Sequence, residues 1–360
     1  MKNLLPNSIK NMSHCCMTVL MFFLISFGAK AADYYWVNGS GNWSDFANHW
    51  ATSSGASVFH NQVPSPNDNV FFDANSLSAN QQVYLDVDAF CNDMTWTSSV
   101  PNCYFHTNSK ITTVGGNFNV NAPMTIYGNG RLNVKGDMNY QPGSGNNNFD
   151  VGDVYLEGNM IIDNMTWNAS WLILDGDITG KTITTNGVRI YGLQMTGDGE
   201  WTLQDDLEVH YETQFRHGSF VTGGNEVDFG WRFYALYSDA DFSFNATGTD
   251  TVRVERRWRI YNTTNVNLNM ASSTLLMEYT GADHFYFDGG NKTYHDVVVH
   301  MDHTNSSHTA YIRNNNVFND FKGRFASQQR IQLEGQGDVM NDVELEWIYD
   351  GNANFTGIAY

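Results

Sequence analysis

One short motif recurs along the middle of this chain about every 20 residues. It reads apolar, any, apolar, any, Gly, Asp or Asn, apolar, and its clear copies are 132–138, 154–160 and 172–178. A looser copy, with Asp205 in place of Gly, runs through Asp205 and Asp206. Intervals of 20, 22 and 18 residues separate the successive glycines Gly116, Gly136, Gly158 and Gly176. This spacing is typical of solenoid coils, none of which can bury its apolar residues alone.

Alternation within the motif predicts strands whose apolar side chains point into a shared interior. Gly followed by Asp or Asn predicts a corner where positive φ is easily reached. Stacked coils would pair in parallel, and asparagines at equivalent corners are expected to form ladders. The sequence therefore predicts an all-β parallel β-helix, with coils that become irregular after residue 205. An antiparallel sandwich or barrel is the alternative, but a 20-residue recurrence is not a hairpin spacing.

Composition agrees with many short strands joined by tight turns. Asp outnumbers Glu by 28 to 10, and a short carboxylate favours turns over helices. The formal net charge of −19 argues against nucleic-acid binding, which needs a basic face for phosphate contacts.

The beginning of the chain predicts export. Residues 1–31 contain three lysines and no acid, then an apolar stretch and Ala29-Lys30-Ala31. This order is typical of a secretory signal peptide, and its apolar run is shorter than the ~20 residues that span a bilayer. Its removal would take the net charge from −19 to about −22 and would leave no transmembrane segment. Secretion, or display at the outer cell surface, is the expected location.

Two cysteines, Cys91 and Cys103, remain after the leader, which carries away Cys15 and Cys16. In an exported protein such a pair predicts a disulfide. A two-cysteine metal site is the alternative, although no second ligand pair stands at zinc spacing.

The segment 32–110 is predicted to hold an N-terminal cap and the first coils, before β-helix repeats over 111–360. Its tryptophans Trp36, Trp43 and Trp50 lie within 15 residues of sequence. They predict either a platform for sugar stacking or an aromatic plug that closes the open end of the solenoid. The plug is favoured because an uncapped end would pair with other chains.

Several strings resemble the large exported repeat proteins of Bacteroidetes-type bacteria. These strings are the aromatic opening at 35–44, the Pro-Asn-Asp-Asn-Val-Phe-Phe-Asp run at 66–73, the cysteine-bearing strand at 91–97 and the unit at 273–299. The resemblance implies a right-handed parallel β-helix of the pectin-lyase-like and haemagglutinin-like kind. It also implies an adhesin or surface-layer role, and such proteins usually carry a type IX secretion sorting domain. This chain ends at Tyr360 without a separate C-terminal module, so a truncated product, or export by another route, is expected.

A basic run supplies the candidate ligand-binding residues Arg256, Arg257, Trp258 and Arg259. Guanidinium groups can hold an anionic glycan, and an indole ring can stack on a sugar or on an arginine. A solvated coil face is the competing interpretation, because charged residues alternate with apolar ones here.

Asp205 and Asp206, followed by His217, are the nearest approach to the carboxylates of a β-helix hydrolase. Glycosidases need two carboxyl groups about 5 to 10 Å apart, but adjacent strand residues face opposite ways. A solenoid corner is therefore the favoured interpretation, and we predict no catalytic and no metal-binding residues. The Asp-rich turns leave Ca²⁺ as an open alternative, without a recognisable calcium loop.

The sequence thus predicts a secreted or cell-surface structural and adhesion protein. Polysaccharides, or glycans on host or neighbouring surfaces, are its expected partners, and no catalysis is expected. The alternative is a polysaccharide lyase or glycoside hydrolase of the β-helix type, because the active sites of such enzymes assemble from distant coils.

Overall fold

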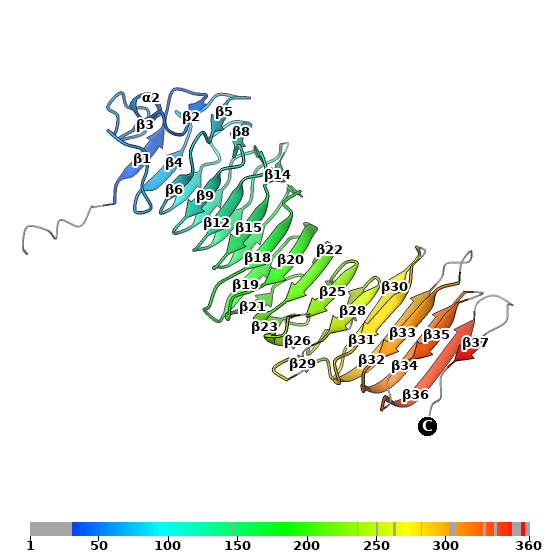
Figure 1. Ribbon diagram of the computed structural model, residues 1–360. Helices are drawn as coiled ribbons and strands as arrows, with labels where there is room; N and C mark the ends of the chain where they lie inside the picture. Colours follow the sequence, from blue (N-terminus) through cyan, green and yellow to red (C-terminus); the bar gives the residue numbers. More distant parts are fainter. Residues whose placement is uncertain are drawn as a thin grey trace, which may run out of the picture.

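The computed structural model describes residues 31–145, 147–235, 237–249, 251–261, 264–281, 283–301, 307–326, 329–334, 337–347 and 354–356. Residues 1–30, which hold nearly all of the expected signal peptide, lie outside this part. The described strands stack into an elongated rod of about 12 turns (Figure 1). The parallel β-helix prediction is confirmed. The described residues include no helix long and apolar enough to cross a membrane.

Four sheets form the sides of the rod, and we call them A, B, C and D. Sheet A contains β3 (Trp50–Ala51), β1 (Asp33–Trp36), β4 (Asn69–Phe72), β7 (Met94–Trp96), β10 (Phe118–Val120), β13 (Met138–Tyr140), β16 (Met160–Ile162), β19 (Lys181–Thr184), β21 (Glu200–Leu203), β23 (His217–Val221), β26 (Asp241–Asn245) and β29 (Asn267–Asn269). Sheet B contains β2 (Gly41–Asn42), β5 (Gln82–Tyr84), β8 (Cys103–His106), β11 (Met124–Tyr127), β14 (Asn148–Asp150) and β17 (Thr166–Trp167).

Sheets C and D form the remaining sides and extend to the far end of the rod. Sheet C contains β6 (Ala89–Cys91), β9 (Ile111–Val114), β12 (Arg131–Val134), β15 (Asp153–Leu156), β18 (Trp171–Leu174), β20 (Ile190–Met195), β22 (Leu207–Phe215), β25 (Arg232–Ala235), β28 (Arg257–Ile260), β31 (Phe285–Asp288), β33 (Thr309–Arg313), β35 (Arg330–Leu333) and β37 (Asn354–Thr356). Sheet D begins with the first residues of β22 and continues with β24 (Val227–Asp228), β27 (Thr251–Val254), β30 (Thr274–Tyr279), β32 (Thr293–Met301), β34 (Val317–Phe325) and β36 (Val339–Trp347).

The cross-section of the rod changes along its length. Each early coil visits sheets C, A and B in turn, as in β9, β10 and β11. Sheet B ends at β17, and sheet D takes over as the third side from β24 onward. Sheet A ends at β29, and the strands described after it all belong to sheets C and D. The first irregularity therefore occurs at β17, earlier in the chain than the predicted residue 205.

The described strand pairs are parallel except where β3 pairs with β1 at the N-terminal end of sheet A. Because neighbouring strands pair in parallel, each inward-pointing residue lies next to an inward-pointing residue of the following coil. One such column in sheet C is fully buried, and its rings Phe233 and Trp258 stack 4.2 Å apart between centroids. The alternative of an antiparallel sandwich or barrel is therefore wrong.

A ladder of side chains joins the coils at the corner between sheets C and A. Asp93 accepts the backbone N–H of Asn117 at 2.7 Å, and Asn117 accepts that of Asp137 at 2.9 Å. Asp137 then accepts the N–H of Asn159 at 2.8 Å, and Asn159 accepts that of Thr182 at 2.9 Å. The expected corner ladders are present, and each Asp or Asn side-chain oxygen accepts a backbone N–H of the next coil.

The glycines of the motif are required for a reason that the sequence did not indicate. Gly116, Gly136, Gly158 and Gly176 do not have positive φ, so that part of the prediction is wrong. Instead, a Cβ added to Gly158 would lie 2.1 Å from the carbonyl oxygen of Gly136. The coils therefore approach too closely at this corner for any side chain.

Gly158→Ala should lower the free energy of unfolding by about 1–3 kcal/mol, because the backbone must shift to admit the methyl group. The matched control is Gly115→Ala in the same kind of corner, where the new Cβ would be 3.5 Å from its nearest neighbours. Urea denaturation of both variants measures the difference. Equal midpoints would contradict close backbone contact as the reason for this glycine.

Asp137→Ala should destabilise the rod by about 1–2 kcal/mol, because the N–H and the Nδ2 of Asn159 both lose their acceptor. Asp137→Asn keeps an oxygen at that position and should lose much less. The thermal midpoint followed by circular dichroism measures both variants. If the asparagine variant were as unstable as the alanine variant, the carboxylate charge, and not its acceptor geometry, would be responsible.

The N-terminal end is closed by an aromatic cluster. Trp36, Trp43 and Trp50 are completely buried, and the short helix α2 (Phe46–His49) lies between the last two. The ring of Trp50 packs edge-on against Trp36 at 4.9 Å and Trp43 at 4.7 Å. The plug prediction is confirmed, and the sugar-platform alternative is wrong because the rings are not accessible.

Cys91 and Cys103 are free thiols, so the predicted disulfide is wrong. Cys91 lies in sheet C at an inward position that Val114 occupies in the next coil. Cys103 lies in sheet B at an inward position that Met124 occupies in the next coil. Burial raises the pKa of Cys103 to about 12 and that of Cys91 further. Both cysteines therefore act as small core residues.

Candidate functional site

The outer face of sheet C carries two columns of charged and aromatic side chains from β22 to β35. Outward residues of successive strands align because the strands are parallel and alternate in facing. One column contains Glu212, Arg232, Arg257, Tyr286, Tyr311 and Gln332. The other contains Gln214, Tyr234, Arg259, Asp288 and Arg313. We call these two columns the Arg–Tyr face.

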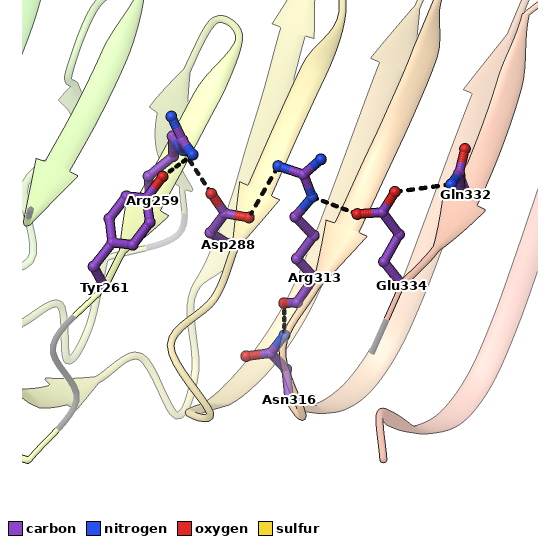
Figure 2. A network of polar contacts seen from close by, with 7 residues as sticks. All are labelled: Arg259, Tyr261, Asp288, Arg313, Asn316, Gln332 and Glu334. Carbon is purple, nitrogen blue, oxygen red and sulfur yellow. Dashed lines mark hydrogen bonds and ion pairs between the residues drawn. The ribbon is translucent and has the colours of Figure 1, made fainter. Parts of the chain in front are cut away.

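A continuous chain of polar contacts crosses this face (Figure 2). Arg259 donates from Nε to Asp288 at 2.6 Å, and the other oxygen of Asp288 is 3.8 Å from Arg313. Arg313 donates to Glu334 at 2.6 Å, and Gln332 donates to the second oxygen of Glu334 at 2.8 Å. Each contact before the last joins neighbouring coils, so the network connects β28 to the end of β35.

Tyrosine rings fill the space between the guanidinium groups. Arg257 and Arg313 each lie 5.3 Å from the ring centre of Tyr286, and Tyr286 stacks on Tyr311 at 5.2 Å. Arg259 lies 4.8 Å from the ring centre of Tyr261, which is 54% exposed. Such cation–π contacts hold the guanidinium planes in fixed positions.

Charges on the face are nearly balanced, although the chain as a whole is acidic. Partial burial tends to lower the pKa of Arg313, but Glu334 and Asp288 outweigh it and raise that pKa above its ordinary value. A shallow depression of about 260 Å³ lies between the paired groups, lined by Arg259, Ile260, Tyr261, Asp288, Gly290, Asn291, Arg313 and Asn314. The face can thus offer ring surfaces and hydrogen-bond donors to a ligand without a large net charge.

The four predicted ligand-binding residues separate in the structure. Arg257 and Arg259 lie on the Arg–Tyr face, as the alternation requires. Trp258 points into the core, is fully buried, and donates to the Tyr294 hydroxyl at 2.9 Å, so the prediction that it stacks on a sugar is wrong.

Arg256 is also removed from ligand contact, because it is only 8% exposed. It pairs with Asp283, and its guanidinium lies 4.7 Å from the ring centre of Trp231 and 5.0 Å from that of Tyr279. This arginine therefore joins coils rather than presenting a charge.

Sequence reasoning missed the partners that complete the face, namely Tyr286, Asp288, Tyr311, Arg313 and Glu334. The signal was present as three short strings with one alternation, Arg-Trp-Arg at 257–259, Tyr-Phe-Asp at 286–288 and Tyr-Ile-Arg at 311–313. Unequal spacing of 29 and 25 residues hid their equivalence. Only the strand register aligns them.

Asp205 and Asp206 serve the solenoid corner. Asp205 accepts the backbone N–H of Thr185 at 2.8 Å, and Asp206 accepts that of Glu226 at 2.9 Å. His217 lies 3.7 Å from a third carboxylate, that of Asp198. Both Asp205 and Asp206 are therefore engaged with backbone donors of adjacent coils. Within the described residues, no group of three or more His, Cys, Asp or Glu side chains could hold a metal ion.

A second set of carboxylates lies on sheet D, where a depression of about 340 Å³ contains Asp228, Arg253, Glu255, Glu278 and Tyr279. Burial raises the pKa of Asp228, and the nearby charge of Glu208 adds to this effect. Burial also raises the pKa of Glu255, with a contribution from Asp228. Carboxyl groups of this kind hold a proton at higher pH than usual, which suits proton donation.

The raised pKa of Asp228 predicts a pH dependence of stability. A group whose pKa is higher in the folded state stabilises it at low pH, and that contribution is lost as pH rises through the folded pKa. Wild type should therefore lose stability relative to Asp228→Asn as pH rises from about 4. Thermal midpoints from about pH 2 to pH 8 measure this trend.

Asp239→Asn is the control of opposite sign, because hydrogen bonding to Arg216 lowers the pKa of the exposed Asp239. The stability that Asp239 contributes is complete above about pH 4 and should disappear as pH falls below that value. Parallel pH profiles for the two variants would contradict the assignment.

Comparison of the chain with protein-family models, with curated proteins and with solved structures gives no match.

Proposed function

We propose that this protein is a secreted or cell-surface structural and adhesion protein that binds polysaccharide on the Arg–Tyr face without catalysing a reaction. One observation carries the proposal: guanidinium and phenol groups repeat in register from coil to coil along this face. An extended polymer with repeating units suits such a periodic surface. Rings can stack on sugar faces, and guanidinium groups can bond hydroxyl or carboxylate oxygens.

Charge distribution supports an acidic polysaccharide as the ligand. The net charge of −19 would repel such a polymer from most of the rod. On the Arg–Tyr face, the four arginines outnumber Glu212, Asp288 and the adjoining Glu334, so this repulsion is locally reduced. The leader-like residues 1–31 and the resemblance to exported repeat proteins support a location where such polymers occur.

The interlocked coils support the structural part of the proposal. The corner ladder ties successive coils from Asp93 to Thr182, and the network of Figure 2 ties those from Arg259 to Glu334, which favours a stiff rod. A stiff rod holds a binding face at a distance from its point of attachment.

The alternative function, a polysaccharide lyase or glycoside hydrolase, is favoured by the depression on sheet D. Asp228 and Glu255 have raised pKa values there, and Arg253 and Tyr279 lie beside them. A protonated carboxyl beside a second carboxyl is the basic requirement of glycoside hydrolysis.

Replacement of Arg257, Arg259 and Arg313 together by alanine should weaken binding to acidic polysaccharides at least tenfold, because the face loses its outward donors. A glycan array followed by titration calorimetry on the best ligand measures this loss. Replacement of Arg131, Lys135 and Lys181 by alanine removes the same charge elsewhere and should have little effect. Unchanged binding by the first variant would contradict the proposed face.

A screen for cleavage of polysaccharides distinguishes the adhesion function from the enzymatic one. Reducing-sugar and lyase-absorbance assays over acidic polysaccharides, with and without Ca²⁺, should show none. Turnover that Asp228→Asn abolishes would replace the adhesion proposal with the enzymatic one.

A further inference from the structure

An open depression of about 740 Å³, which we call the cavity, lies where sheet B ends, between β17 and the sheet C strands β20 and β22. β17 is the last strand of sheet B, and the next coil passes from β19 directly to β20. The turn between them contains Asn186 and Gly187, whose φ values of 49° and 76° reverse the chain within two residues. This coil therefore has no strand in sheet B. The coil before it, which ends in β17 of sheet B, extends beyond it as a shelf.

A β-bulge shapes one wall of the cavity. Ile190 pairs with Val209 but Gly192 pairs with Glu212, so His210 and Tyr211 together lie opposite Tyr191. Bulges re-aim side chains, and Tyr191 and His210 both line the cavity. Tyr191 is 41% exposed and stacks on Tyr211 with ring centres 5.4 Å apart. The wall thus presents a fixed aromatic ring to solvent.

An unpaired acceptor lies just beneath the surface that lines the cavity. Asn147 is only 6% exposed, and its Nδ2 donates to the carbonyls of Gly143 at 2.8 Å and Asn164 at 2.9 Å. These two bonds fix the amide, and its Oδ1 has no hydrogen-bond partner among the described residues. The Nδ1 atom of His210 is buried without a partner as well. Buried polar atoms of this kind are destabilising unless something pairs with them.

The lining is rich in amides and nearly neutral. Further amide and hydroxyl groups come from Asn164, Thr166, Asn168 and Asn186. Asp163 contributes one negative charge, and Arg189 is paired with Glu208 at 2.8 Å. Amides both donate and accept, which matches hydroxyl groups, and the absence of unpaired cations in this lining disfavours phosphate or sulfate.

We propose that this cavity binds an uncharged oligosaccharide. Tyr191 stacks on a sugar ring, while the amide and hydroxyl groups that line the cavity pair with its hydroxyls. The volume falls within the usual range for small-ligand sites. A peptide added to the edge of β17 is disfavoured, because this strand has only two residues to offer main-chain hydrogen bonds.

The test uses the chain from residue 32 onward and neutral hexaoses of β-1,4-glucan, α-1,4-glucan, β-1,4-mannan and β-1,4-xylan. At least one should bind in titration calorimetry, and Tyr191→Ala should weaken that binding at least tenfold. Tyr191→Phe keeps the ring and should bind nearly as wild type does. Phe90→Ala is the matched control, since Phe90 is a 40% exposed ring on the same sheet.

Thr166→Val is a second variant that preserves shape and removes only a hydroxyl from the lining, and it should weaken binding several-fold. Failure of all four hexaoses to bind would overturn the proposal, as would equal affinity in wild type and Tyr191→Ala. Binding of an extended peptide in competition with the hexaose would also overturn it. The triple arginine variant should keep its affinity for the neutral hexaose. The experiment therefore tests ligand binding in this cavity independently of polysaccharide binding on the Arg–Tyr face.

Discussion

Successive coils meet at the corner between sheets C and A with carbonyl oxygen and glycine Cα in direct contact. This approach leaves no room for a side chain at Gly136 or Gly158, and it brings each Asp or Asn within reach of the next N–H. The corner therefore sets the vertical register of the coils. Every column of side chains, inside and outside the rod, depends on that register.

The register has opposite consequences on the two sides of a strand. Inside, it stacks large rings such as Phe233 and Trp258, which bury apolar surface without polar partners beyond a single hydroxyl. Outside, it places like side chains within contact distance, where equal charges would repel. On the Arg–Tyr face, Arg259, Asp288 and Arg313 alternate in charge, and the neighbouring Arg232 and Arg257 lie beside Glu212 and Asp283, so the outer surface gains cohesion between coils.

Changes in the number of sides create the surfaces that differ from the repeating pattern. Loss of sheet B after β17 leaves a shelf, an aromatic wall and an Asn147 Oδ1 atom with no partner among the described residues, while loss of sheet A after β29 leaves two long-stranded sheets. The two proposed ligand sites differ in the same way. One repeats with the coils and suits a polymer of repeating units, and the other occurs at a single irregular coil and suits a short neutral segment.

The sequence by itself determined the coil, because alternation and the recurring Gly-Asp or Gly-Asn are local properties that each coil repeats. It also determined the cap, since three tryptophans before the first coil have no other large apolar surface to cover. Only the tertiary structure decided which residues meet between coils. Cys91 and Cys103 lie in different sheets, and Trp258 points into the core. Asp288 pairs with both Arg259 and Arg313, which lie at unequal distances from it along the chain. These outcomes depend on loop lengths between strands, which vary freely at the surface and leave no periodic signal in the sequence.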